Sequence, residues 1–301
     1  MFKLLSNESN IFSIPVYLIF LGFVIFTFNV LDFSLINSLS AFITFAGIAL
    51  AYFLFNTINL TYQTHIPLFL YTILVFALLP GNIDIGIAVS LFTNSFILLM
   101  LTSTDDQLKR NSQLLIGSIL AINFIFLPTT WPLMIFVLIH ILFTSDRIAQ
   151  SIFKLFFGML IIAFSYFCVM FYLHYTTWDP QYFPFSSMQL KSDYYPLTLL
   201  SPVALLTAYS VMDHFKHFNK KSPKSKFKYS FVLVFSLAQL VTICLYMDTT
   251  YEYLLLLAFP ISIILCRGLH FMPKYWYKEV SLWVIICSLL LFKAATYIEL
   301  F

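Results

Sequence analysis

Long apolar stretches separated by short polar or proline-containing breaks make up most of the chain. Because a helix needs about 20 apolar residues to cross about 30 Å of hydrocarbon, such stretches are typical of transmembrane helices. The expected fold is therefore all-α: a polytopic membrane helix bundle forming one integral membrane domain over residues 1–301. Dividing the chain at the breaks predicts eleven transmembrane helices: 11–31, 35–55, 65–80, 83–101, 107–127, 132–150, 154–174, 196–213, 229–247, 252–269 and 280–298.

The segments at 107–127 and 132–150 are the least regular of these, because their purely apolar cores are too short to cross a bilayer alone. They form either two full spans with amphipathic ends or a re-entrant pair around Pro128 and Pro132. We favour full spans, since the Thr-Asp-Asp-Gln sequence at 104–107 resembles a capping box for a long helix.

Composition supports a membrane protein. Hydrophobic residues make up 61% of the chain and charged residues 10%, whereas soluble chains have about 45–50% and about 25%. The net charge of +3 is too small to indicate a nucleic-acid-binding protein. The four cysteines lie within apolar stretches, without paired spacing. We therefore expect neither a metal site nor a cofactor.

The distribution of basic residues predicts the orientation. If the N-terminus is cytoplasmic, every Lys and Arg except Lys191 and Lys293 falls on the cytoplasmic side of the eleven-helix layout. Short cytoplasmic loops of membrane proteins carry an excess of Lys and Arg. We therefore expect the N-terminus inside, the C-terminus outside, and a location in the cell inner membrane.

Carboxylates at the outer ends of the helices are the first candidate site. Asp32, Asp84 and Asp248 are the candidate catalytic residues, with Glu252 nearby. At the outer membrane surface such groups suit a general base or a divalent cation acting on a lipid-linked substrate. The alternative is structural, because Asp84 and Glu252 stand where acidic residues stabilise helix N-termini.

An aromatic outer loop is the second candidate. Trp178, Asp179 and Tyr182 are candidate substrate-binding residues that would stack against a sugar ring or an acyl chain. Aromatic residues also collect at membrane interfaces without any ligand. Both interpretations remain open.

A basic inner loop at 213–228 contains six lysines, of which Lys216, Lys220, Lys221 and Lys224 are the candidate lipid-headgroup residues. Each lysine beside an anionic membrane surface contributes about 1 kcal/mol of attraction. Membrane lipids are therefore expected partners, although the same lysines also fix topology.

Polar side chains in or near the predicted spans are Asn29, Asn59, Asn94, Asn123, His140 and Gln239. Such residues usually face the bundle interior. A polar cavity around the last four of these at the midplane is what a small-solute transporter requires, and otherwise they are packing groups. Arg147, at a cytoplasmic helix end, is explained by its side chain reaching the membrane surface.

The seven glycines are scattered, without a Gly-xxx-Gly pair. Close helix packing through small residues is therefore not expected. Contacts between bulky Phe and Leu surfaces should hold the helices together.

Several local patterns carry a resemblance. They are the short polar N-terminus ending at Asn10, Phe-Leu-Pro at 126–128, Arg147 followed by Gly158, and Phe-Pro-Ile-Ser at 259–262. In these the chain resembles an uncharacterised multi-pass inner-membrane protein family of Bacteroidota. The resemblance implies a location and not an activity.

A looser similarity is to polyprenyl-phosphate-sugar-dependent membrane glycosyltransferases. Those enzymes place a catalytic acid in the first outer loop, where this chain has Asp32, but the loop here is much shorter. The outer face also lacks an Arg to hold a lipid diphosphate.

These observations predict an inner-membrane protein of cell-envelope biogenesis that handles a lipid-linked substrate at the outer face, with enzymatic activity left open. The alternatives are a non-catalytic subunit of an inner-membrane complex and a small-solute transporter. An outer pocket lined by the acids supports the first, an exposed helix face the second, and a polar midplane cavity the third.

Overall fold

The computed structural model describes residues 1–9, 12–29, 34–58, 60, 64–79, 83–102, 106–174, 197–218, 222–247 and 251–298. Within these residues every regular secondary-structure element is a helix. The only β-type pairing among them is an isolated bridge between Glu8 and Thr64. Six helical segments are long and apolar enough to cross a membrane, which confirms the predicted class of protein.

The helices follow the predicted segments closely, and each of the eleven segments corresponds to one of the helices α2 to α12. The α-helices are α1 (Phe2–Leu5), α2 (Ser13–Asn29), α3 (Leu35–Ile58), α4 (His65–Leu78), α5 (Ile85–Thr102), α6 (Asp106–Phe126), α7 (Trp131–Thr144), α8 (Ile148–Tyr172), α9 (Ser201–Lys216), α10 (Pro223–Tyr246), α11 (Ala258–Phe271) and α12 (Tyr275–Ile298). Three 3-10 helices precede α7, α9 and α11: η1 (Pro128–Thr130), η4 (Leu197–Leu200) and η6 (Glu252–Leu257).

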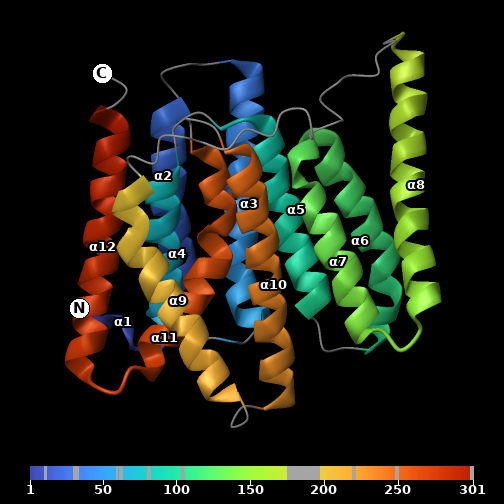
Figure 1. The fold of residues 1–301 in the computed structure, drawn as a ribbon. Helices are drawn as coiled ribbons and strands as arrows, with labels where there is room; N and C mark the ends of the chain where they lie inside the picture. The colour runs from blue at the N-terminus through green and yellow to red at the C-terminus, as the bar shows by residue number, and fades with distance from the viewer. Residues whose placement is uncertain are drawn as a thin grey trace.

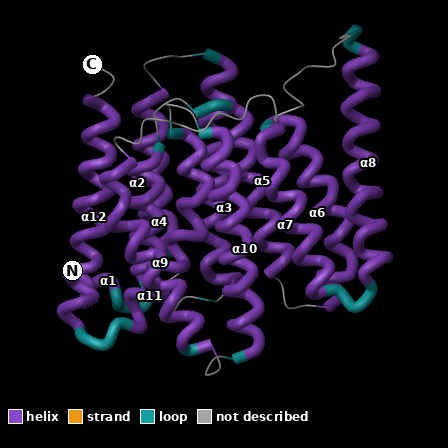
Figure 2. The backbone as a smooth tube through the Cα atoms, viewed as in Figure 1, coloured by secondary structure: helices purple, strands orange, loops and turns teal. Residues whose placement is uncertain are grey.

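The helices from α2 to α12 run alternately up and down through one bundle (Figure 1). The connections collect at its two ends (Figure 2). We call one of these the basic end, because it carries α1 and the turns from α7 to α8, α9 to α10 and α11 to α12, with Lys3, Arg147, Lys216 and Lys274. We call the other the opposite end, and α12 finishes there (Figure 1).

The middle of the bundle is built from α4, α5 and α11, whose side chains are mostly buried. By contrast, α8 stands at one edge of the bundle (Figure 1) and buries only Leu155 and Gly158 of its 25 residues. Beyond Lys154 its side chains are mostly apolar, and many of them, such as Phe164 and Phe171, are exposed. A helix that is apolar on all sides suits a membrane span that faces lipid.

Single glycines form close helix crossings, so the expectation of no close helix packing through small residues was wrong. A Cβ on Gly117 of α6 would overlap the carbonyl of Leu155 in α8, and one on Gly158 of α8 would overlap the carbonyl of Leu114 in α6. Gly47 meets the backbone of α5 at Phe92 in the same way. These contacts need only one glycine per helix face, which explains why no Gly-xxx-Gly pair marks them.

Three lysines contact the carbonyl ends of neighbouring helices. Lys228 of α10 donates to the carbonyl of Ile58 at 2.9 Å, and Lys278 of α12 to that of His270 at 2.7 Å. Lys293 of α12 donates to the carbonyl of Leu79, where α4 stops before Pro80. The last carbonyls of a helix lack partners within it and attract cations. The sequence placed Lys293 on the outer side of the membrane, whereas in the structure it is buried, with 7% of its surface exposed.

The predicted basic loop is shorter than the sequence suggested, because α9 continues to Lys216 and α10 begins at Pro223. The hydroxyl of Ser222 caps α10 by accepting from the N–H of Ser225 at 3.4 Å, and Pro223 occupies the first helical turn. Serine followed by proline is a favourable helix start. Lys224 and the lysines that follow it are consequently helical.

Candidate functional site

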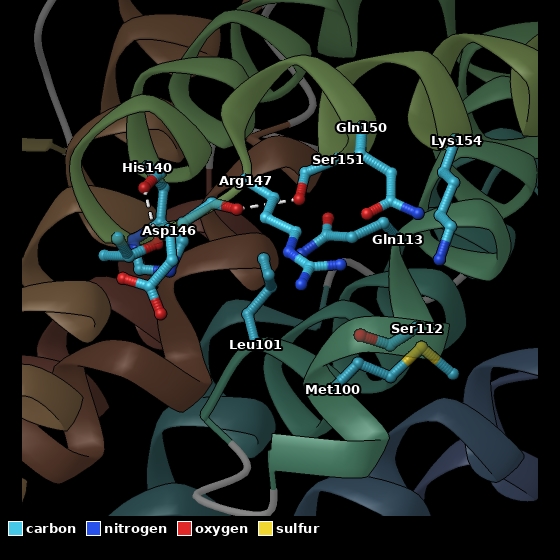
Figure 3. Close-up of a pocket in the computed structure, with 12 residues that line it drawn as sticks. Met100, Leu101, Ser112, Gln113, His140, Asp146, Arg147, Gln150, Ser151 and Lys154 are labelled. Atoms are coloured by element: carbon cyan, nitrogen blue, oxygen red, sulfur yellow. Dashed lines mark hydrogen bonds between the residues drawn. The ribbon is translucent and has the colours of Figure 1, made fainter.

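A polar cavity of about 380 Å³ opens at the basic end, between α5, α6, α7 and α8 (Figure 3). Most of its lining residues carry polar or charged side chains, which is unusual in a chain this apolar. They are Met100, Leu101, Ser112, Gln113, His140, Thr144, Ser145, Asp146, Arg147, Gln150, Ser151 and Lys154.

The turn from α7 to α8 is held by its own hydrogen bonds. Thr144 donates its hydroxyl hydrogen to the carbonyl of His140 at 2.7 Å, and the hydroxyls of Ser145 and Ser151 are 2.7 Å apart. The N–H of Ser151 donates to the carbonyl of Arg147 at 3.0 Å. These contacts fix the start of α8, from which three long polar side chains extend.

The glycine crossing of α6 and α8 sets the width of the cavity. Gln113 lies one helical turn before Gly117, and Lys154 lies one turn before Gly158. The two helices touch through backbone at the glycines, whereas one turn away their long side chains line an open space. The close contact thus positions Gln113 and Lys154 on facing walls.

The cavity has the charge and hydrogen-bonding groups to hold a phosphate. Among the described lining residues, Arg147 and Lys154 contribute two cations and Asp146 one carboxylate. Figure 3 shows Arg147 and Gln150 extending from α8 toward Gln113. Guanidinium and ammonium groups make charge-assisted hydrogen bonds to phosphate oxygens.

Gln113 supplies a second kind of contact. The residue is 9% exposed, and no described group pairs with its Oε1 atom. A buried carbonyl oxygen without a partner is costly, so the site favours a molecule that brings a hydroxyl or N–H donor. A ligand with both phosphate and hydroxyl groups matches the whole lining.

His140 closes the side of the cavity nearest α10. Its ring lies 4.6 Å from that of Phe231, edge to face, and 5.6 Å from that of Phe227. These aromatic contacts hold the imidazole at the boundary between the apolar bundle and the polar cavity. His140 therefore packs against aromatic rings of α10, as a packing group would, and also lines the polar cavity.

Most of the residues predicted as site residues fall outside the described part of the chain. This applies to two of the three candidate catalytic acids, the three aromatic-loop residues and two of the lysines: Asp32, Asp248, Trp178, Asp179, Tyr182, Lys220 and Lys221. Their proposed roles stay predictions.

Asp84 acts as a helix cap in the structure. Its Oδ2 atom accepts from the N–H of Gly86 at 2.9 Å, and its carbonyl accepts from the N–H of Ala88 at 3.0 Å. The carboxylate of Glu252 lies beside it and accepts a hydrogen bond from its backbone. These contacts match the structural interpretation of Asp84, whereas Glu252 contacts the start of α5 and not of its own helix.

Two of the candidate headgroup lysines are within the described chain. Lys216 is exposed at the end of α9. Lys224 lies in the first turn of α10, not in a loop.

Three of the four polar residues predicted for the middle of the bundle are buried. Asn94, Asn123 and Gln239 are 5%, 1% and 1% exposed. The cavity beside Asn94 measures about 20 Å³, which is room for about one water molecule. His140, the fourth of these residues, lines the polar cavity at the basic end, so the transporter alternative stays a prediction.

Sequence reasoning missed the cavity, although one signal was present. Arg147, Gln150, Ser151 and Lys154 recur at helical spacing and mark a polar face at the start of an otherwise apolar helix. The partners on α6 gave no such signal.

Comparison with known proteins adds a family and no activity. No curated protein and no solved structure matches the chain. A family model matches residues 1–301 over their whole length, and the chain therefore belongs to DUF6427, a family of unknown function.

Proposed function

We propose that this chain is a multi-pass protein of the cell inner membrane with eleven spans, whose basic end faces the cytoplasm. The support is the alternating course of α2 to α12 together with the gathering of basic residues at one end. Short cytoplasmic loops rich in Lys and Arg are the usual pattern. In this orientation the N-terminus is inside and the C-terminus outside.

We further propose that the polar cavity binds the phosphate- and hydroxyl-bearing headgroup of an anionic lipid, as part of cell-envelope biogenesis. The observation that carries this function is the convergence of Arg147 and Lys154 on a cavity lined by the buried amide of Gln113, whose oxygen has no partner among the described residues. The proposal keeps the lipid-linked substrate predicted from the sequence and moves its site to the basic end.

The neighbouring surface favours a lipid over a soluble anion. Phe153 and Phe157 stand on the same helix as the cavity residues, with 69% and 46% of their surfaces exposed and their rings stacked 6.1 Å apart. In a membrane these rings contact hydrocarbon chains at the depth where headgroups begin. A lipid can therefore place its phosphate in the cavity and its chains against α8.

Native mass spectrometry of the purified full chain tests the proposal. We compare retention of phosphatidylglycerol and of phosphatidylcholine with identical chains. Wild type should retain phosphatidylglycerol preferentially. Arg147→Gln with Lys154→Gln should lose at least about tenfold in affinity, because a tenfold loss is about 1.4 kcal/mol and each hydrogen bond to a charged group contributes about 1.5–3 kcal/mol. Lys274→Gln, which removes an exposed lysine elsewhere at the basic end, is the matched control.

Glycerol phosphate distinguishes the source of the phosphate. If it displaces phosphatidylglycerol at low concentration, the site takes a soluble anion and the lipid proposal is wrong. Equal retention by wild type and the double variant would also overturn it. Weak competition by glycerol phosphate, with loss in the double variant alone, supports a lipid headgroup.

A further inference from the structure

A second, apolar cavity of about 610 Å³ lies between α9 and α10. Its floor consists of residues from α4, α11 and α12, and it shares no lining residue with the polar cavity. Almost all of its lining is aliphatic, including Leu200, Val211 and Leu233. The space is larger than the polar cavity and different in chemistry.

Small side chains deepen the cavity where the two helices face one another. Ala204 and Ala208 contribute from α9, and Ser236 contributes from α10. Small residues at facing positions usually let two helices approach closely. Here α9 and α10 stay apart along this stretch, so the small residues leave an open space.

Aromatic stacking at the basic end holds the two helices apart. The ring of His214 in α9 stacks on that of Tyr229 in α10 with centroids 3.8 Å apart, and both residues are almost fully buried. The guanidinium of Arg267 in α11 lies 5.0 Å from the centre of the Tyr229 ring. A Cβ on Gly268 would overlap Ser210, so α9 is also seated tightly on α11. The helices are therefore spaced by packed groups, and the cavity does not depend on a loose arrangement.

The cavity is open along its side. Leu237 and Leu240 line it and remain 51% and 47% exposed. At the basic end the lining reaches Phe215, and the next residue is the exposed Lys216. An occupant thus meets an aliphatic channel for most of its length and a positive charge at the basic end.

We propose that this cavity binds a hydrocarbon chain of an anionic phospholipid, with the lipid phosphate beside Lys216. In a spanning bundle the open side faces the bilayer, where acyl chains are the molecules at hand. From Val203 to Phe215 the lined face of α9 spans 13 residues, which is a rise of about 18 Å at 1.5 Å per residue. That length fits one leaflet of about 15 Å of hydrocarbon with the headgroup at its end.

Photo-crosslinking in nanodiscs tests this site. The full chain is reconstituted with phosphatidylglycerol that carries a diazirine at the end of one acyl chain, and labelled peptides are mapped after irradiation. Wild type should be labelled mainly on the cavity faces of α9 and α10. Ala208→Phe fills the space and should lower that labelling about fivefold. Leu205→Phe, on the exposed face of the same helix, is the matched control and should leave it unchanged.

Ser236→Phe fills the cavity from α10 and guards against a folding defect of the first variant. Labelling of exposed α8 positions reports that each variant is folded and inserted. Uniform labelling of all lipid-facing helices, or unchanged labelling in both filled variants, would overturn the proposal. Equal labelling by the phosphatidylcholine analogue would contradict the preference for an anionic phospholipid and the proposed contact of its phosphate with Lys216. Because Arg147→Gln with Lys154→Gln leaves this cavity intact, failure of either site is recognised separately.

Discussion

Buried lysines in an apolar bundle need a partner, and the carbonyl ends of helices provide it. Lys293 reaches the carbonyl of Leu79, which is itself 1% exposed, and its ammonium lies 6.0 Å from the centre of the Phe76 ring. Replacing it by an apolar side chain of similar length leaves that carbonyl without this donor. Lys293→Met should therefore lower the free energy of unfolding by about 1–3 kcal/mol.

The measurement is the apparent melting temperature in detergent. Lys274→Met makes the same chemical change at an exposed position and should have little effect. If Lys293→Met were as stable as Lys274→Met, the contact with Leu79 would not contribute to stability.

The sequence predicts the contacts of single side chains less well than it predicts the positions of helices. It shows where Lys293 and Lys228 stand along the chain, but the carbonyls that they contact belong to distant helices. Asp84 was easier, because its cap is made with the N–H of Gly86 two residues away. Contacts between residues close in the sequence can be predicted from their spacing, whereas contacts between helices can be predicted only once the packing of the helices is known.

Helix crossings through glycine give a prediction at the scale of the element. Glycine to alanine within a helix normally stabilises by about 1 kcal/mol. At Gly117 we expect the opposite sign, because the new methyl group overlaps the backbone carbonyl of Leu155 and must push α8 away. Gly117→Ala should lower the melting temperature and weaken phosphatidylglycerol retention, since Gln113 and Lys154 then lose their spacing.

Gly22→Ala is the matched control for this crossing. Its Cβ would lie 3.3 Å from a ring carbon of Phe45, and that flexible side chain can yield. If Gly117→Ala were as stable as Gly22→Ala, the α6–α8 crossing would be looser than the structure shows.

Most helices were predictable because a membrane span is a strong local signal, with some 20 apolar residues in one run. The predicted start of α10 was wrong by several residues, because the lysines there were interpreted as part of a loop. Ser222 and Pro223, a favourable helix start, mark the true beginning of the helix. The polar cavity was not predictable in the same way. Gln113 and Lys154 come from two helices far apart in the sequence, which pack closely at the glycine crossing.

The proposed orientation is a prediction about the whole molecule. Single cysteines replacing Ser34 at the opposite end and Ser222 at the basic end should react differently with a membrane-impermeant maleimide. On intact cells with a permeabilised outer membrane, the first should be labelled and the second protected. The experiment uses a background in which the native cysteines are replaced by alanine: Cys168, Cys244, Cys266 and Cys287. Labelling of both sites from one side would refute the alternating course across the membrane.

The central claim is that the polar cavity at the basic end holds a lipid headgroup, and an experimental map shows this most directly. We would determine the structure of the full chain in nanodiscs of phosphatidylglycerol by electron cryomicroscopy. The account predicts headgroup density between Arg147, Lys154 and Gln113, with the acyl chains running along α8. A cavity without lipid density in a map that resolves lipids elsewhere around the bundle would contradict it.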